Sequence, residues 1–423
     1  MSAPHDANDG VLEGLQDVTD GVEPGSEAGH LARRIDDLVA AVETDLVEIR
    51  RDIHAHPELA RQEVRTTRLL AQRLRQAGLT PTLLERTGLV CDIGPETSGP
   101  AGERGRLALR ADIDALPVAD SCGRPWTSGV PGVAHACGHD VHAAVVLGAG
   151  LALAALDADG LLARGVRLIF QPAEETMPGG ALDVIAQGML DGVDAIAAVH
   201  CEPKLDVGYA GTRIGPITSA SDAVSVTVSS GGGHTSRPHL TGDVVYALGQ
   251  VITQVPAVLG RRLDPRSGVN LTWGAVHAGN AHNAIPATGS VSGTLRCLDV
   301  RAWERAGQVL HDAVEQVVAP YDVDVTVRHA RGVPPVDNDA TITAALEDAA
   351  RAVLGSEGVV LTEQSLGGED FAWYLTKVPG AMVRLGTATP GARRYDLHQG
   401  DLVVDERAIG MGARLLARFA LGA

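Results

Sequence analysis

Short apolar segments that alternate with helical segments constrain the fold of this chain more than any other feature. Segments 89–93, 106–111, 166–170 and 195–199 are apolar and have the length of strands, whereas 143–156 has the length and composition of a buried helix. Strands that alternate with helices are typical of a layered α/β domain with a largely parallel sheet. We therefore predict an α/β fold built on a mixed, mostly parallel sheet.

The pattern changes between residues 217 and 331. Alternating apolar residues at 223–229 predict a half-buried strand, and the segments that follow predict the order β-α-β-β-α-β of a ferredoxin-like α+β domain. We therefore predict that residues 29–216 and 332–423 form one α/β domain, into which residues 217–331 are inserted. Residues 1–28 are acidic and rich in glycine, and we predict that they form a disordered tail.

Charge and hydropathy disfavour several classes of protein. The chain has 35 basic and 53 acidic residues and a formal net charge of −18, which disfavours binding to nucleic acid or to an anionic membrane. The longest apolar run, 143–156, is too short to span a bilayer. The N-terminus does not resemble a signal peptide, and the five cysteines show no CxxC spacing. We therefore expect a cytoplasmic protein without a disulfide framework.

Polar residues follow directly after three of the predicted strands. Asp112 and Asp114 follow the first of these strands, Glu174 and Glu175 the second, and His200 the third. Ligands of open α/β sheets bind outside the carboxyl ends of the strands. We therefore expect these side chains to converge at one edge of the sheet.

The segment HACGHD at 135–140 is the densest group of potential metal ligands. Its cysteine and its second histidine are separated by one glycine, so that both can turn toward one site from a tight loop. With residues from other strand ends they form a mixed sulfur, nitrogen and oxygen set, which suits zinc or another first-row ion and could hold two ions bridged by one ligand. The five candidate ligands are Cys137, His139, Glu175, His200 and His398.

Two adjacent glutamates at 174 and 175 can have different roles. One can bind a metal ion while the other, Glu174, stays free to accept a proton from a water molecule as general base. Two other interpretations of these residues stay open. Cys137 could be a nucleophile activated by His139 or His135, or the chain could bind metal without catalysis.

Three polar positions stand out in the predicted inserted domain. His234 follows three glycines, Asn283 begins NAIP and Arg296 ends GTLR. An arginine can hold a carboxylate through a bidentate pair. Taken singly, however, each of these positions is typical of an exposed loop or a sheet edge.

Taken in order, the motifs HACGHDVH, FQPAEE, GGHTSRPH, NAIP, GTLR and GGEDF resemble those of the metal-dependent aminoacylase and carboxypeptidase superfamily. The resemblance runs from about His54 to Glu406. It is strongest to the branch of hippurate hydrolases, N-acyl-amino-acid amidohydrolases and indole-acetyl-amino-acid hydrolases. It implies an enzyme that hydrolyses the amide bond of N-acyl amino acids with two divalent ions, zinc or alternatively manganese or cobalt. A dipeptidase or carboxypeptidase of the same superfamily is the alternative.

The resemblance also implies roles for the residues of the α/β domain. Cys137 would lie between two metal sites, Glu174 would be the general base, and Asp114, with Asp112 as a further candidate, would orient a ligating histidine. The other histidines and cysteines, including His54 and Cys122, are interpreted as structural. The remaining metal ligands implied by the resemblance are His139, Glu175, His200 and His398.

For the inserted domain the resemblance implies a lid that also forms the interface of a homodimer. His234 would point into the active site of the other subunit and stabilise the oxyanion there. Asn283 and Arg296 would hold the polar end of the substrate, its free carboxylate. Closure of such a lid would exclude water from the reaction.

Overall fold

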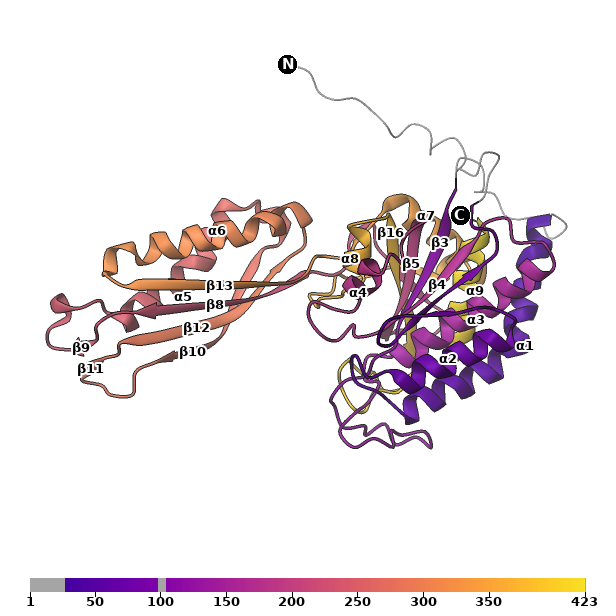
Figure 1. The fold of residues 1–423 in the computed structure, drawn as a ribbon, viewed down its shortest axis with the longest axis horizontal. Helices are drawn as coiled ribbons and strands as arrows, with labels where there is room; N and C mark the ends of the chain where they lie inside the picture. Colours follow the sequence, from indigo (N-terminus) through magenta and orange to yellow (C-terminus); the bar gives the residue numbers. More distant parts are fainter. Residues whose placement is uncertain (1–26, 98–103, 423) are drawn as a thin grey trace, which may run out of the picture.

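The structure is a computed structural model, and it describes residues 27–97 and 104–422. These residues form two lobes, the larger at the right and the smaller at the left of Figure 1. The predicted tail lies outside the described residues except for its last two positions, which begin helix α1 (Glu27–Ala55). Residues 27 and 28 are therefore helical.

The larger lobe is built on an eight-stranded sheet in the order β1-β2-β4-β3-β5-β16-β6-β15. Its four central strands are parallel: β4 (Val166–Gln171), β3 (Arg106–Asp112), β5 (Val193–Asp206) and β16 (Gly380–Ala388). Antiparallel pairs join β1 to β2, β2 to β4, and β16 to β6, which confirms the predicted mixed, mostly parallel sheet. The outer strands are β1 (Thr82–Leu83), β2 (Leu89–Ile93), β6 (Ala210–Thr212) and β15 (Val359–Leu361).

Alternate residues of the strands face two hydrophobic cores. On β4, for example, Leu168 packs in the core of the face that carries the long helices, and Ile169 packs in the core of the opposite face. The first core is completed by α1, α2 (Val64–Gln76), α3 (His139–Ala158), α7 (Ala340–Leu354) and α9 (Arg407–Gly422). The second core is covered by α4 (Ala181–Ala186) and α8 (Ala372–Leu375).

Helix α3 is the apolar run that the sequence shows at 143–156. It has the length and hydropathy of a membrane span, but 72% of its most apolar window is buried inside the protein. Leu147 and Leu153, for example, are fully buried. The prediction of a buried core helix is therefore confirmed.

The smaller lobe contains an antiparallel sheet in the order β10-β12-β8-β13, and α5 and α6 pack on it around a separate core. Figure 1 shows it joined to the larger lobe by the ends of β8 and β13. The buried carboxylate of Asp222 fastens this junction, because it accepts hydrogen bonds from the Trp303 indole (2.9 Å) and the Gly332 amide (3.0 Å). The elements are β8 (Ala220–Ser229), α5 (Val244–Arg262), β10 (Asn270–Ala278), β12 (Thr288–Cys297), α6 (Val300–Val318) and β13 (Asp324–Val333).

Four further two-residue strands form two small sheets. β7 (Gly215–Pro216) pairs with β14 (Asp337–Asn338) where the chain passes between the lobes. β9 (Gly233–His234) pairs with β11 (Ala284–Ile285). Figure 1 shows this second pair at the end of the smaller lobe that lies farthest from the larger sheet.

Candidate metal centre

The structure brings all five predicted ligands together at the carboxyl ends of the central strands. The Cys137 sulfur lies 3.7 Å from His200 Nε2. Glu175 Oε1 lies 3.4 Å from His398 Nε2 and 3.8 Å from His139 Nε2. The central strand that carries His200 is longer than predicted, because β5 continues to Asp206 through its pairing with β16.

A glycine sets the geometry of the turn before α3. Gly138 has φ = 86°, and a Cβ atom there would lie 2.8 Å from the sulfur of Cys201. Both the left-handed conformation and the close approach therefore require glycine. The prediction of a loop is correct for Cys137, whereas His139 is already the first residue of α3.

Hydrogen bonds fix the tautomers of the two buried histidines. His139 Nδ1 lies 2.9 Å from the carbonyl oxygen of Asp114, and His200 Nδ1 lies 2.8 Å from that of Cys201. Because a carbonyl oxygen can only accept, each Nδ1 carries a proton, which leaves Nε2 of each ring as the atom that can bind a metal ion. This arrangement is typical of metal-ligating histidines, whose second nitrogen is held by a neighbouring group.

Two buried atoms of the cluster have no hydrogen-bond partner among the described residues. They are Nε2 of His139 and Oε1 of Glu175, which face each other. Buried polar atoms without partners are rare, since desolvation is not compensated. A divalent cation between them would satisfy both, so the donor set fits the metal that the sequence predicts.

Burial controls the ionisation of the cluster. It raises the pKa of Cys137 to about 12. A cysteine nucleophile needs a lowered pKa, so this environment does not support Cys137 as a nucleophile. Burial, followed by the nearby charges of Glu369 and Glu175, raises the pKa of Glu174 well above its ordinary value, which favours the protonated form that a general acid needs.

Asp114 positions both glutamates. Its two carboxylate oxygens accept the backbone N–H groups of Glu174 and Glu175, each at 3.0 Å. Its carbonyl oxygen also accepts a hydrogen bond from the Nδ1–H group of His139. Asp114 therefore holds the turn after β4 and one histidine in fixed positions relative to each other.

Asp112 has a related role at the end of β3. Its Oδ1 lies 2.6 Å from His142 Nδ1, and His142 Nε2 accepts the backbone N–H of Cys201 at 2.8 Å. Both side chains are fully buried. This pair ties the end of β3 to α3 and β5, and it supports the strand that carries His200.

Sequence reasoning missed a buried ionic network behind Glu174. The guanidinium of Arg110, which is 1% exposed, contacts Asp112 Oδ2 at 2.6 Å, Asp370 Oδ1 at 2.8 Å and Glu369 Oε1 at 3.1 Å. The backbone N–H of Asp370 lies 3.4 Å from Glu174 Oε1. An arginine inside the apolar segment LALRAD was the available signal, because a buried strand admits a guanidinium only beside carboxylates.

The structure does not bring His234 or Asn283 to the cluster of their own chain. His234 is in β9 and Asn283 immediately precedes β11, at the far end of the smaller lobe (Figure 1). The two are neighbours, since the Thr235 N–H donates to the carbonyl of Asn283 at 3.3 Å. Arg296 is on β12 at the opposite end of the lobe and donates to the carbonyl of Leu366, in the loop that leads to Glu369.

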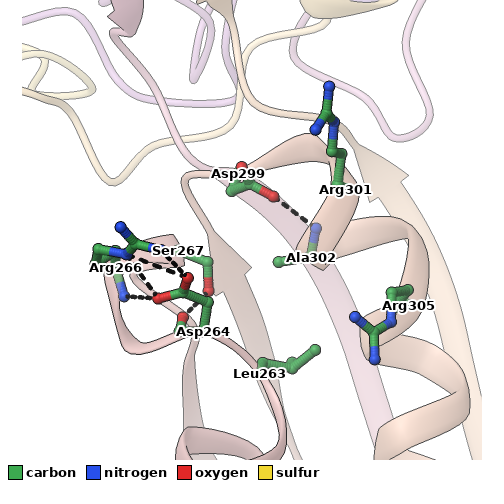
Figure 2. A pocket seen from close by; sticks show the side chains of 8 residues that line it. All are labelled: Leu263, Asp264, Arg266, Ser267, Asp299, Arg301, Ala302 and Arg305. Carbon is green, nitrogen blue, oxygen red and sulfur yellow. Dashed lines mark hydrogen bonds and ion pairs between the residues drawn. The ribbon is translucent and has the colours of Figure 1, made fainter. Parts of the chain in front are cut away.

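A surface cavity of the smaller lobe, where α6 begins, lies outside this cluster (Figure 2). Arg266 pairs with Asp264 there, and Asp299 accepts the backbone N–H of Ala302 as the cap of α6. All eight lining residues belong to segments 263–267 and 299–305. Arg266, Asp264 and Asp299 therefore already have partners within the protein, which indicates a structural role for these groups.

Comparison with known proteins identifies relatives over most of the chain. The model of peptidase family M20/M25/M40 matches residues 108–422. N-acetyl-L-cysteine deacetylase of Bacillus subtilis is 36% identical over 373 residues, which cover 88% of this chain and 86% of the relative. The solved structure of a dinuclear metal-binding peptidase of family M20 from the same organism has a TM-score of 0.77 and 33% identity, and the match covers 90% of this chain and 98% of that one.

A further relative is longer than this chain. It is a Rhodococcus jostii protein provisionally named glutamate–cysteine ligase 2-3, and it is 50% identical over 375 residues. The match covers 88% of this chain but only 46% of the relative. The ligase name therefore describes a protein of which this chain spans less than half.

Proposed function

This chain belongs to peptidase family M20/M25/M40, and from that premise we propose that it hydrolyses the amide bond of N-acyl amino acids. Family membership makes it a metal-dependent amidohydrolase or peptidase. One observation carries the proposal. Glu174, a carboxyl only 7% exposed, lies 3.9 Å from His139 Nε2, and neither this nitrogen nor Glu175 Oε1 has a hydrogen-bond partner among the described residues.

The cluster would hold two divalent ions through Cys137, His139, Glu175, His200 and His398. When bound, such ions supply Lewis acidity, which lowers the pKa of a water molecule and polarises an amide carbonyl. Sulfur, imidazole and carboxylate together suit zinc, and manganese or cobalt are alternatives. The hydrogen bonds from Nδ1 of His139 and His200 support this assignment, because they leave Nε2 of each ring free for a metal ion.

In this proposal Glu174 moves the proton. Its carboxylate accepts a proton from the attacking water and delivers it to the amide nitrogen as the C–N bond breaks, which yields a carboxylic acid and a free amino acid. Asp114 holds the backbone of Glu174, so that the carboxylate stays within reach of the reacting atoms. Burial raises the pKa of Glu174, which favours the protonated form that donates to the amide nitrogen.

We further propose that His234 stabilises the oxyanion in the active site of a second copy of the chain. Because His234 lies at the far end of its own smaller lobe, it could serve only a pocket that another subunit brings near. Exposed apolar side chains on this lobe, Leu240 at 69% and Tyr246 at 56%, support an interface there. Asn283 would act beside His234, and Arg296, at the junction of the lobes, would bind the free carboxylate of the substrate.

The identity of the acyl group on the substrate is the more specific part of the proposal. The relative named N-acetyl-L-cysteine deacetylase supports a short acyl group on an amino acid. The solved relative described as a peptidase supports the alternative, a dipeptide or a peptide with a free C-terminus. The two differ in the group on the acyl side of the scissile bond.

The test is amino-acid release from N-acetyl, N-benzoyl and long-chain N-acyl amino acids, with dipeptides as the comparison. The same preparation is assayed as purified, after chelation, and after reloading with zinc, manganese or cobalt. We expect release from an N-acyl amino acid that stops on chelation and returns with one ion. Release from dipeptides alone would favour the peptidase alternative, and release that ignores chelation would refute the metal-dependent mechanism.

A further inference from the structure

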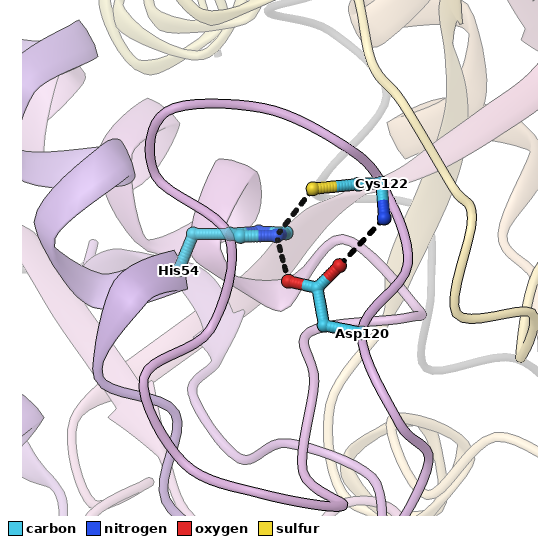
Figure 3. Close-up of side chains that lie close together, drawn as sticks. All are labelled: His54, Asp120 and Cys122. Carbon is cyan, nitrogen blue, oxygen red and sulfur yellow. Dashed lines mark hydrogen bonds and ion pairs between the residues drawn. The ribbon is translucent and has the colours of Figure 1, made fainter.

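A second group of potential metal ligands lies outside the cluster around Glu174. It consists of His54 in the last turn of α1, and of Asp120 and Cys122 in the loop between β3 and α3 (Figure 3). His54 Nε2 lies 3.2 Å from Asp120 Oδ2 and 3.9 Å from the Cys122 sulfur. One ligand atom from each residue lies within 4.8 Å of the other two.

These separations match those of a tetrahedral zinc site. Zinc binds imidazole nitrogen and carboxylate oxygen at about 2.0–2.2 Å and thiolate sulfur at about 2.3 Å, which places neighbouring ligand atoms roughly 3.2–3.8 Å apart. The His54–Asp120 separation lies within this range and the His54–Cys122 separation just above it, so the three side chains approach the arrangement of one face of a tetrahedron. An ion could enter after small movements of these side chains.

The surroundings hold His54 in the required orientation. Its Nδ1 lies 2.8 Å from Asp140 Oδ2, and because a carboxylate only accepts, Nδ1 carries a proton and Nε2 faces Asp120 and Cys122. The guanidinium of Arg50 neutralises Asp140 through a 2.7 Å contact and also approaches Nδ1 at 3.2 Å. A carboxylate behind a histidine is the usual second partner of a zinc-binding imidazole.

The loop is also ordered toward His54. The Asp120 carboxylate accepts the backbone N–H groups of Cys122 at 2.8 Å and Ser128 at 2.7 Å. The Cys122 sulfur lies 3.4 Å from the hydroxyl of Thr127. These contacts fold the loop back on itself, so that the carboxylate and the thiol point to the same imidazole (Figure 3).

Without a metal ion, this position holds a positive charge. Burial alone would lower the pKa of His54, but the charge of Asp140 and hydrogen bonds to Asp120 and Asp140 outweigh it and raise the pKa to about 10. The imidazolium therefore balances Asp120, while Arg50 balances Asp140. A divalent ion with a neutral imidazole, a carboxylate and a thiolate has the same total charge, so either form is electrostatically balanced in this buried position.

We propose that His54, Asp120 and Cys122 bind a divalent transition-metal ion, zinc by the chemistry of its ligands, at a site separate from the pair around Glu174. On binding, the Nε2 proton of His54 and the thiol proton of Cys122 pass to solvent, and bonds form from the metal to nitrogen, sulfur and oxygen. A water molecule completes the tetrahedron. The ion would join the loop before HACGHD to α1, and through Asp140 to the first turn of α3.

Metal content tests the proposal in the full chain. Wild type, Cys122→Ala and the control Cys297→Ala, which removes a buried thiol in the smaller lobe, are loaded with zinc, freed of excess ion and analysed for zinc per chain. We expect Cys122→Ala to hold one ion fewer than wild type and Cys297→Ala to hold the same number as wild type. Equal content in wild type and Cys122→Ala would overturn the proposal, whatever the occupancy of the cluster around Glu174.

Cobalt gives a second readout, whose first step uses a variant that keeps Cys122. In a Cys137→Ala background the thiol of the first cluster is gone, so any cobalt–thiolate charge-transfer band must come from another cysteine. We expect this band in Cys137→Ala and its loss in the Cys122→Ala, Cys137→Ala double variant. Absence of the band from cobalt-loaded Cys137→Ala, or its persistence in a folded double variant, would overturn the assignment to Cys122. Because neither readout needs turnover, failure of the proposed amidohydrolase activity would remain distinguishable.

Discussion

Replacing Arg110 by methionine is a stringent test of the ionic network behind Glu174. The guanidinium is enclosed by Asp112, Glu369 and Asp370 and by the amide oxygen of Gln171 at 2.9 Å. Methionine has a similar length and no charge. The substitution therefore leaves buried carboxylates without their cation while changing the packing little.

The expected cost follows from these contacts. Removing one partner of a buried ion pair costs about 3–5 kcal/mol, because the remaining charge is uncompensated. Asp370 keeps two other donors, the Gln171 side-chain amide at 2.8 Å and the Ala181 N–H at 3.0 Å, so its carboxylate is only partly uncompensated in the variant. We therefore expect a loss near the lower end of the range, about 3 kcal/mol in the free energy of unfolding.

The loss should depend on pH in a defined direction. Burial would raise the pKa of Asp112, but the charges of Arg110, His139 and His142 outweigh it and hold the pKa well below its ordinary value. Wild type therefore gains stability from this carboxylate above the ordinary pKa of aspartate, roughly 3.9, and loses it as pH falls through the depressed value. Without Arg110 the carboxyl protonates at a higher pH, so the deficit of the variant should shrink on acidification.

Urea unfolding of metal-free protein at about pH 7.5 and about pH 4 measures both effects. The control is Arg266→Met, which removes a guanidinium that is paired with Asp264 on the surface. This control should have the same midpoint urea concentration of unfolding as wild type. A deficit for Arg110→Met below about 1 kcal/mol, or one of equal size at both pH values, would refute the reasoning.

Three further predictions concern the catalytic arrangement. Glu174→Gln should lower kcat by about two to four orders of magnitude and leave the metal content unchanged, as initial rates and metal analysis would show. The control Glu357→Gln, at an exposed position, should leave kcat unchanged. Near wild-type turnover of Glu174→Gln would contradict the role of Glu174. Mixing inactive His234→Ala and Glu174→Gln chains should restore part of the activity, because one pocket of a mixed dimer has both groups intact; no recovery after subunit exchange would contradict action across the interface. Gly138→Ala should bind metal more weakly than wild type, as measured by equilibrium dialysis. Gly160→Ala is also at positive φ but has open space around its Cβ position, so it should keep the wild-type affinity. Equal affinities of the two variants would contradict the steric argument.

The fold could be predicted from the sequence because its signal is local. Apolar segments of strand length fix β2 at the predicted residues 89–93, and the segment predicted at 166–170 is β4 with one residue more. Ends were less predictable where pairing with a distant strand decides them. β5 continues seven residues past the predicted end at 199, because its partner β16 is encoded almost two hundred residues later.

The candidate site was predictable to the extent that its residues follow strand ends. Convergence of Asp114, Glu175 and His200 follows from parallel strands that share one edge. The partners of these residues were not predictable in the same way. Asp114 holds the backbone of Glu174 and Glu175 through its two carboxylate oxygens, and Arg110 lies behind Glu174. Both arrangements depend on side-chain directions, and that of Arg110 depends also on a contact with Glu369, more than 250 positions away.

The first turn of α3 shows why those directions matter. Its residues His139, Asp140 and His142 are all buried, yet they face different partners: the cluster around Glu174, the imidazole of His54, and the carboxylate of Asp112. From residue 143 onward the same helix is apolar and packed in the core, so the polar turn is carried by a rigid element. A shift of α3 that improved one of these contacts would therefore strain the others. The site around Glu174 and the site proposed at His54 are consequently coupled through one helical turn, and a metal ion at His54 would hold His139 in place without contacting it.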